Sequence, residues 1–103
     1  MHLVQILLPL RGPDGTAFAH GQYTRVAREL TETFGGMTAY ARAPASGLWQ
    51  EEDSGETTHD DIVVYEVMID GIDAEWWAAY RTDLERRFAQ QELVVRAQEM
   101  RRL

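Results

Sequence analysis

Residues 34–50, FGGMTAYARAPASGLWQ, are the stretch that decides the fold. Gly35-Gly36 is suited to ending a helix, because glycine adopts the left-handed backbone conformation without the steric cost of a Cβ atom. From 37 to 42 two sets of side chains alternate, which is strand spacing because successive strand residues point to opposite faces. Turn formers at 44–47 interrupt the strand before Leu48-Trp49 resumes it. We therefore predict the second strand of a small α+β sheet, kinked and leading into a hairpin.

The residues before this stretch predict a strand followed by a helix. Residues 3–10 are apolar on both faces apart from Gln5, which is typical of a central strand. Residues 11–15, RGPDG, are dense in turn formers and predict a loop. From about 21 to 34, apolar side chains recur at helical spacing. The stripe that this helix would bury consists of Tyr23, Val26, Ala27, Leu30 and Phe34.

The residues after the stretch predict a strand, a helix and a last strand. Residues 51–61 are polar and form the expected hairpin loop. Residues 62–69 are apolar at every position except Glu66 and give the clearest strand signal. Asp73 is a suitable N-cap for a helix running to about residue 89, with 93–100 as the last strand. The buried stripe of that helix is expected to be Trp77, Tyr80, Leu84 and Phe88.

The resulting order, β-α-β-β-α-β, predicts a ferredoxin-like fold. Two right-handed crossovers of this kind give a four-stranded antiparallel sheet in the order 4-1-3-2, with two helices on one face. A chain of 103 residues has the size of one domain with one core, so we expect residues 1–103 to form a single ferredoxin-like domain. The face opposite the helices would then have nothing from its own chain over it.

Three short motifs carry a resemblance to known proteins. They are the run FGGMTAY at 34–40, the G-x-W at 47–49 and the RFAQ at 87–90 before a short apolar strand. With these motifs the chain resembles an uncharacterised family of short bacterial α+β proteins of similar length, over nearly the whole chain. The resemblance implies a ferredoxin-like domain and carries no activity with it.

Charge and composition exclude several classes of partner. The net charge is −7, and six of the acidic residues lie within 51–61, where there is no Lys or Arg. This balance argues against nucleic acid and anionic membranes, which select basic patches. The apolar run at the N-terminus is too short for a membrane span and lacks the basic region of a signal peptide, so we expect a cytoplasmic protein. The absence of cysteine removes disulfides, thiolate nucleophiles and Cys-ligated metals.

The sheet face opposite the helices carries the candidate site. Its apolar side chains would leave a large patch in water, and such patches mark interfaces or ligand grooves. We therefore predict a homodimer that packs sheet on sheet, with the alternative that the dimer also encloses a pocket for a small molecule. Glu66 needs a partner because a buried carboxylate is costly alone, and the neighbouring strand could supply one from Arg42 or Tyr40. The candidate ligand-binding residues are Gln5, Tyr40, Arg42, Glu66 and Arg96.

No metal or cofactor site is predicted. His2, His20 and His59 are far apart in the sequence and fall on different elements, which does not favour a shared metal. The carboxylates around His59 lack the calcium-loop pattern of an EF-hand, and runs of like charge usually remain in water. No phosphate-binding glycine loop or nucleophile elbow is present.

The adjacent tryptophans Trp76-Trp77 cannot both face the centre of the core, because neighbouring helix positions lie about 100° apart. Trp77 belongs to the predicted buried stripe. Trp76 would cover a flank, either at the core edge or on a partner surface.

Two functions from different classes remain open from the sequence. The leading interpretation is a small cytoplasmic homodimer that acts as a non-catalytic module binding a ligand or a protein partner. The alternative is a small enzyme of the dimeric α+β-barrel type, acting on a compact organic substrate in a pocket on the open sheet face. The second rests on fold analogy.

Overall fold

The computed structural model describes residues 1–42 and 62–103, including the side chains of all of these except 40–42. The predicted break and resumption of the second strand at 43–50 and the acidic loop with His59 lie outside the described residues. The elements in chain order are β1 (His2–Pro9), α1 (His20–Phe34), β2 (Thr38–Arg42), β3 (Ile62–Ile69), α2 (Ala74–Arg87) and β4 (Val95–Glu99).

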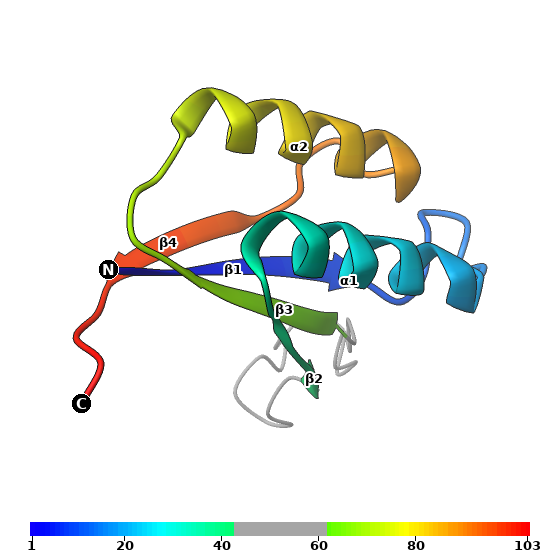
Figure 1. The fold of residues 1–103 in the computed structure, drawn as a ribbon. Helices are drawn as coiled ribbons and strands as arrows, with labels where there is room; N and C mark the ends of the chain where they lie inside the picture. The colour runs from blue at the N-terminus through cyan, green and yellow to red at the C-terminus, as the bar shows by residue number, and fades with distance from the viewer. Residues whose placement is uncertain (43–61) are drawn as a thin grey trace, which may run out of the picture.

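The four described strands form one sheet in the order β2-β3-β1-β4, and every neighbouring pair is antiparallel. Both helices lie over the same face of this sheet (Figure 1). Two helices and a four-stranded antiparallel sheet confirm the predicted α+β class. Within the described ranges, no helix has the length and apolar character needed to cross a membrane.

The core lies between the sheet and the two helices. Alternate residues of β1 and β3 point toward the helices, as strand periodicity requires. The fully or nearly buried side chains of this core are Val4, Ile6, Leu8, Val26, Leu30, Tyr65, Val67, Ile69, Trp77, Leu84, Phe88 and Leu93. Most of the residues of the two predicted helix stripes are among them, with Tyr23, Ala27, Phe34 and Tyr80 packed against the cluster.

The helix ends follow the local sequence signals. Gly35 ends α1 in the left-handed conformation, with φ of 84°, and its N–H donates to the Thr31 carbonyl at 2.8 Å. The Asp73 carboxylate accepts from the Trp76 N–H at 3.1 Å, so the predicted N-cap is confirmed. Both signals worked because each depends on contacts within one turn of chain.

The last strand is shorter than predicted, covering Val95–Glu99 instead of 93–100. Leu93 precedes the strand and is buried in the core, and its N–H donates to the Glu85 carboxylate at 2.9 Å. The Leu93 N–H is thus bound by the Glu85 side chain instead of by a carbonyl of a neighbouring strand. The helix α2 likewise ends at Arg87, two residues before the predicted end.

Trp76 packs at the edge of the core. Its ring meets Phe34 edge-on at 5.2 Å between centroids and stacks on Tyr80 at 4.9 Å. Trp77 is buried and stacks on Phe34 at 5.3 Å. The aromatic rings thus fill the gap between the end of α1 and the start of α2.

Candidate functional site

A row of polar side chains crosses the sheet on the face away from the helices. The strand register pairs Gln5 of β1 with Glu66 of β3 on one side and with Arg96 of β4 on the other. Thr38 of β2 pairs with Glu66 and extends the row to the fourth strand. Directly paired residues share a face, so the fold brings three of the five predicted site residues together.

Hydrogen bonds link these three side chains. The Gln5 Nε2 donates to Glu66 Oε2 at 2.6 Å, and the Arg96 Nε donates to Gln5 Oε1 at 2.8 Å. Glu66 thus has a described partner in Gln5, while the predicted contact with Arg42 or Tyr40 falls on side chains outside the described part. The backbones of Tyr40 and Arg42 belong to β2, opposite Val64 and Ile62, while their side chains lie outside the described part.

The apolar residues around the row differ in exposure. Val64, expected to be open on this face, is fully buried within its own chain. Met68 and Val94 keep 51% and 48% of their surface exposed. The prediction that the apolar side chains of this face are left in water was therefore wrong at Val64, and the exposed Met68 and Val94 lie on opposite sides of the row.

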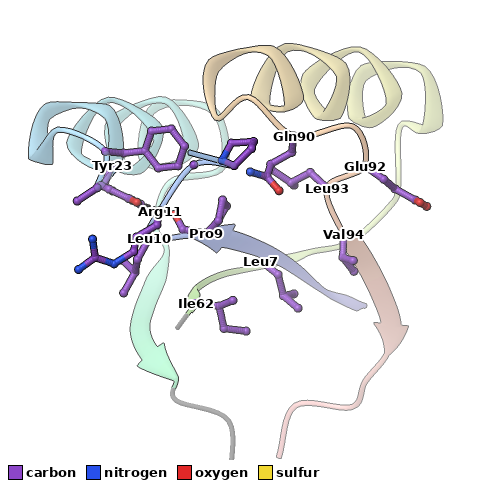
Figure 2. A pocket seen from close by; sticks show the side chains of 14 residues that line it. Leu7, Pro9, Leu10, Arg11, Tyr23, Ile62, Gln90, Glu92, Leu93 and Val94 are labelled. Atoms are coloured by element: carbon purple, nitrogen blue, oxygen red, sulfur yellow. Dashed lines mark hydrogen bonds between the residues drawn. The ribbon is translucent and has the colours of Figure 1, made fainter. Parts of the chain in front are cut away.

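A hollow of about 800 Å³ lies at the carboxyl end of β1, where this face meets the loops. Figure 2 shows the side chains around it. Its walls come from the end of β1 and the following loop, the start of α1, the start of β3 and the segment before β4. The apolar part of the wall is formed by Leu7, Pro9, Leu10, Pro13, Ala17, Phe18, Ile62, Leu93 and Val94.

Two polar side chains border the interior of the hollow. The Tyr23 hydroxyl donates to the Pro9 carbonyl at 2.6 Å, and burial, aided by Tyr65, raises its pKa, so the phenol stays neutral at pH 7. The Gln90 amide donates to the Phe88 carbonyl at 3.0 Å and is directed into the hollow (Figure 2). The amide oxygen of Gln90 and the lone pairs of the Tyr23 hydroxyl can accept hydrogen bonds from a ligand.

Two opposite charges stand at the rim. Arg11 and Glu92 lie on opposite sides of the hollow with their charged ends directed outward (Figure 2). The Arg11 guanidinium donates to the Gly15 carbonyl at 3.0 Å, which ties it to its own loop. Gly15 has φ of 83°, so the tight turn that positions this carbonyl needs a glycine.

None of the three predicted site residues whose side chains are described, Gln5, Glu66 and Arg96, lines the hollow. The sequence indicated only a turn at 11–15, and the segment 90–94 was assigned to a connection and a strand. The two segments are about eighty positions apart, and only the pairing of β1 with β4 brings them side by side. The one local hint is Phe18, an aromatic residue in an otherwise polar loop, which packs edge-on against Phe88 at 5.1 Å.

A second polar cluster joins the two helices, which lie over the other face of the sheet (Figure 1). Arg87 binds Glu29 through both terminal nitrogens, at 2.6 and 2.9 Å, and also Asp83 at 2.6 Å. The Tyr80 hydroxyl donates to Glu29 at 2.9 Å. The hydrogen bond from Arg87 lowers the pKa of Glu29, and burial followed by the Glu29 contact raises the pKa of Tyr80.

The charged groups of this second cluster bind one another, although Arg87 Nε is buried without a hydrogen-bond partner among the described residues. Across residues 1–42 and 62–103, no three His, Cys, Asp or Glu side chains gather into a metal-binding group. The hollow at the end of β1 has the size of a ligand site.

Comparisons with known proteins give a fold and no family. No family model matches the chain, and no curated protein matches it. Among solved structures, the chain is similar to a phage SAM lyase in complex with S-methyl-5'-thioadenosine. The two share 18% sequence identity with a TM-score of 0.61, over 95% of this chain and 80% of the lyase chain. At that identity the likeness shows that this chain has the same type of small α+β fold as the phage enzyme.

Proposed function

We propose that this protein binds a compact organic molecule in the hollow at the carboxyl end of β1. The observation that carries the proposal is the hollow itself, which combines about 800 Å³ of space with a wall that is about half apolar and half polar. Ligand pockets typically measure about 300–1,000 Å³ and have a few well-placed polar groups in an apolar lining. Tyr23 and Gln90 supply such groups on the interior side.

The chemistry of the lining favours a neutral ligand with hydrogen-bond donors and an apolar part. The acceptor oxygens of Tyr23 and Gln90 suit N–H or O–H groups, and the leucine and phenylalanine side chains suit a ring or a thioether. The charges of Arg11 and Glu92 are directed away from the interior. A nucleoside thioether has this combination of groups, and S-methyl-5'-thioadenosine, which the structurally similar lyase holds, is the probe to test first.

A second candidate is a small enzyme acting on such a molecule. It is supported by the likeness to a lyase over 95% of this chain. Because one fold hosts many activities, the support is by analogy. Incubating the protein with SAM and looking for S-methyl-5'-thioadenosine by mass spectrometry tests this candidate directly, and an unchanged SAM signal at high protein concentration would remove it.

The remaining parts of the proposal concern the architecture. The strand order β2-β3-β1-β4, with both helices on one face, supports a ferredoxin-like assignment. The exposed Met68 and Val94 support a homodimer formed through the opposite face of the sheet. We also retain the cytoplasm as the proposed location and the short bacterial α+β family as the proposed relatives.

Binding can be tested by titrating the protein with S-methyl-5'-thioadenosine and following methyl chemical shifts by NMR. We expect the methyl groups of Leu7, Leu93 and Val94 to shift with a common saturation curve, because they line the hollow. Replacing Ala17 with Phe should fill part of the hollow and weaken binding about tenfold or more, the effect of losing roughly 1.4 kcal/mol.

A matched control is Ala78→Phe, which adds the same ring to an exposed site on α2. This variant should bind as the wild type does. Shifts confined to other regions, or equal affinity of the two phenylalanine variants, would contradict the hollow as the binding site.

A further inference from the structure

We infer that the side-chain amide of Gln90 decides which ligand the hollow accepts, and that it selects a flat heterocycle with an amino group beside a ring nitrogen, as in adenine. The inference rests on the proposed ligand site and deepens it by naming the chemical group that is recognised. Gln90 lines the hollow, and its amide is directed into it (Figure 2).

The backbone fixes the place of Gln90 at the end of α2. The Gln90 N–H donates back to the Glu85 carbonyl at 2.9 Å, and Ala89, just before Gln90, has φ of 51°. A left-handed residue with such a return hydrogen bond is a common helix ending, usually built with glycine. Alanine adopts this conformation at a steric cost, and residues held in this way are frequent at ligand sites. The Glu85 carboxylate also accepts from the Leu93 N–H, so both ends of the segment 90–93 are attached to α2.

The side chain of Gln90 is oriented by the residue two positions before it. Its Nε2 donates to the Phe88 carbonyl at 3.0 Å. Because a carbonyl can only accept, this contact assigns which end of the amide is nitrogen and which is oxygen. The Oε1 and the second N–H take part in no hydrogen bond among the described residues. The amide therefore offers the hollow one acceptor and one donor, side by side in one plane.

This pair of groups matches a particular ligand edge. A primary amide makes two hydrogen bonds to a ring edge on which an amino N–H lies beside an acceptor nitrogen, as glutamine does with adenine. Oε1 then accepts from the amino group, and the amide N–H donates to the ring nitrogen. If hydrogen replaces the amino group, Oε1 loses its water on binding and gains no partner, which weakens binding. Gln90 thus distinguishes a ring that carries the amino group from the same ring without it.

Aromatic side chains lie close to this amide in the wall of the hollow. Phe18 and Tyr23 both line the hollow, and both pack against the ring of Phe88, at 5.1 and 5.4 Å between centroids. Phe88 is fully buried, and its carbonyl holds the Gln90 amide. One core residue therefore positions both the polar contact and the aromatic part of the wall. Such a wall suits a flat ring, because aromatic rings pack well on one another.

Comparing two ligands on the full-length protein tests the inference. The probes are S-methyl-5'-thioadenosine and the analogue in which hydrogen replaces the amino group of the base. Isothermal titration calorimetry should show that the wild type binds the first probe about tenfold more tightly, the effect of one hydrogen bond that the analogue leaves unmade. Gln90→Met keeps the length of the side chain without its polar atoms. It should bind the first probe about tenfold more weakly than the wild type and bind the two probes equally.

Gln91→Met is the matched control, because Gln91 is exposed and is not part of the wall of the hollow. This variant should bind both probes as the wild type does. A purely structural role of Gln90 would leave the ratio of the two affinities unchanged. Thermal melts check that each variant is folded. If Gln90→Met does not fold, NMR of the wild type replaces it, and the side-chain N–H resonances of Gln90 should shift more with the first probe than with the analogue.

Equal affinity of the wild type for the two probes would overturn the inference and leave the ligand site in place. The inference is also overturned if Gln90→Met discriminates as the wild type does, if Gln91→Met loses the discrimination, or if the Gln90 resonances shift equally with both probes. If neither probe binds, the proposed ligand site fails and the inference fails with it.

Discussion

Two arginine-centred polar networks lie in the described part of the molecule, and they differ in the burial and in the partners of their arginines. Arg87, between the helices, has 12% of its side chain exposed and is held by two carboxylates. Arg96, on the sheet, is exposed and is held by the neutral amide of Gln5. Both terminal nitrogens of Arg87 donate hydrogen bonds to carboxylates of its own chain. The described hydrogen bond of Arg96 uses Nε, and the side chain is exposed to solvent.

This difference separates a structural cluster from an interaction surface. Strongly shifted pKa values often mark functional sites, and here they occur at Tyr80 and Arg87, both of which contact Glu29. Those groups bind one another and link α1 to α2, so we attribute the shifts to a structural role. In the sheet row the described partner of the Arg96 guanidinium is a neutral amide, and Arg96 itself is exposed, so its charge is accessible to another molecule.

The largest effect is expected at the network around Arg87. Arg87→Ala should lower the free energy of unfolding by about 3 kcal/mol, because it leaves Glu29 and Asp83 beside each other without the shared cation. Arg87→Lys should fall between Ala and wild type, since a lysine cannot form the two-pronged contact. Urea melts measure both changes.

Arg86 provides the matched control, because its side chain is 79% exposed although it also contacts Asp83. Arg86→Ala should change the free energy of unfolding by no more than about 0.5 kcal/mol. Equal effects at the two arginines would show that the network around Arg87 does not hold the helices together.

The next largest effect is expected from a comparison of two valines on the sheet face opposite the helices. Val64→Ala should cost about 2 kcal/mol, because it removes two buried methyl groups. Val94→Ala, at a position 48% exposed, should cost no more than about 0.5 kcal/mol. Urea melts at protein concentrations below the range of self-association keep the comparison to the single chain, and similar costs would contradict the difference in burial.

A smaller effect is expected at Glu66. Glu66→Ala should cost about 1.5 kcal/mol, because it removes the charged acceptor of the Gln5 amide. Glu66→Gln keeps the shape and an acceptor oxygen, and should recover about half of that loss. Thermal melts of the two variants side by side make the measurement, and a larger loss for Gln than for Ala would exclude the described hydrogen bond as the cause.

The smallest effect concerns acid stability. The hydrogen bond from Arg87 lowers the folded-state pKa of Glu29 below its ordinary value of 4.5. Below pH 4.5 the unfolded chain binds this proton before the folded chain does, so stability must fall as the pH falls through that window. Glu29→Gln should flatten this decline, whereas Glu32→Gln, at an exposed position of the same helix, should retain it. Parallel pH profiles for wild type and Glu29→Gln would argue against a contribution from this pair.

The α+β class and the location of most elements could be predicted from the sequence. Periodicity gave both helix stripes, and the end of α1 at Gly35 and the start of α2 at Asp73 were predicted from local capping chemistry. Alternation placed Gln5, Glu66 and Arg96 on one face, where the register joins them. These features depend on contacts within a turn or on the two-residue period of a strand, which a sequence displays directly.

Other features depended on tertiary structure. The burial of Val64, the choice of Gln5 as the partner of Glu66, and the union of 10–18 with 90–94 around one hollow all involve segments far apart in the chain. The sequence by itself determined the elements and the faces of this protein, because backbone geometry fixes which side chains point together. Only the tertiary structure decided which polar groups meet and where space remains, because both follow from strand register and from the packing of connections that carry no periodic signal.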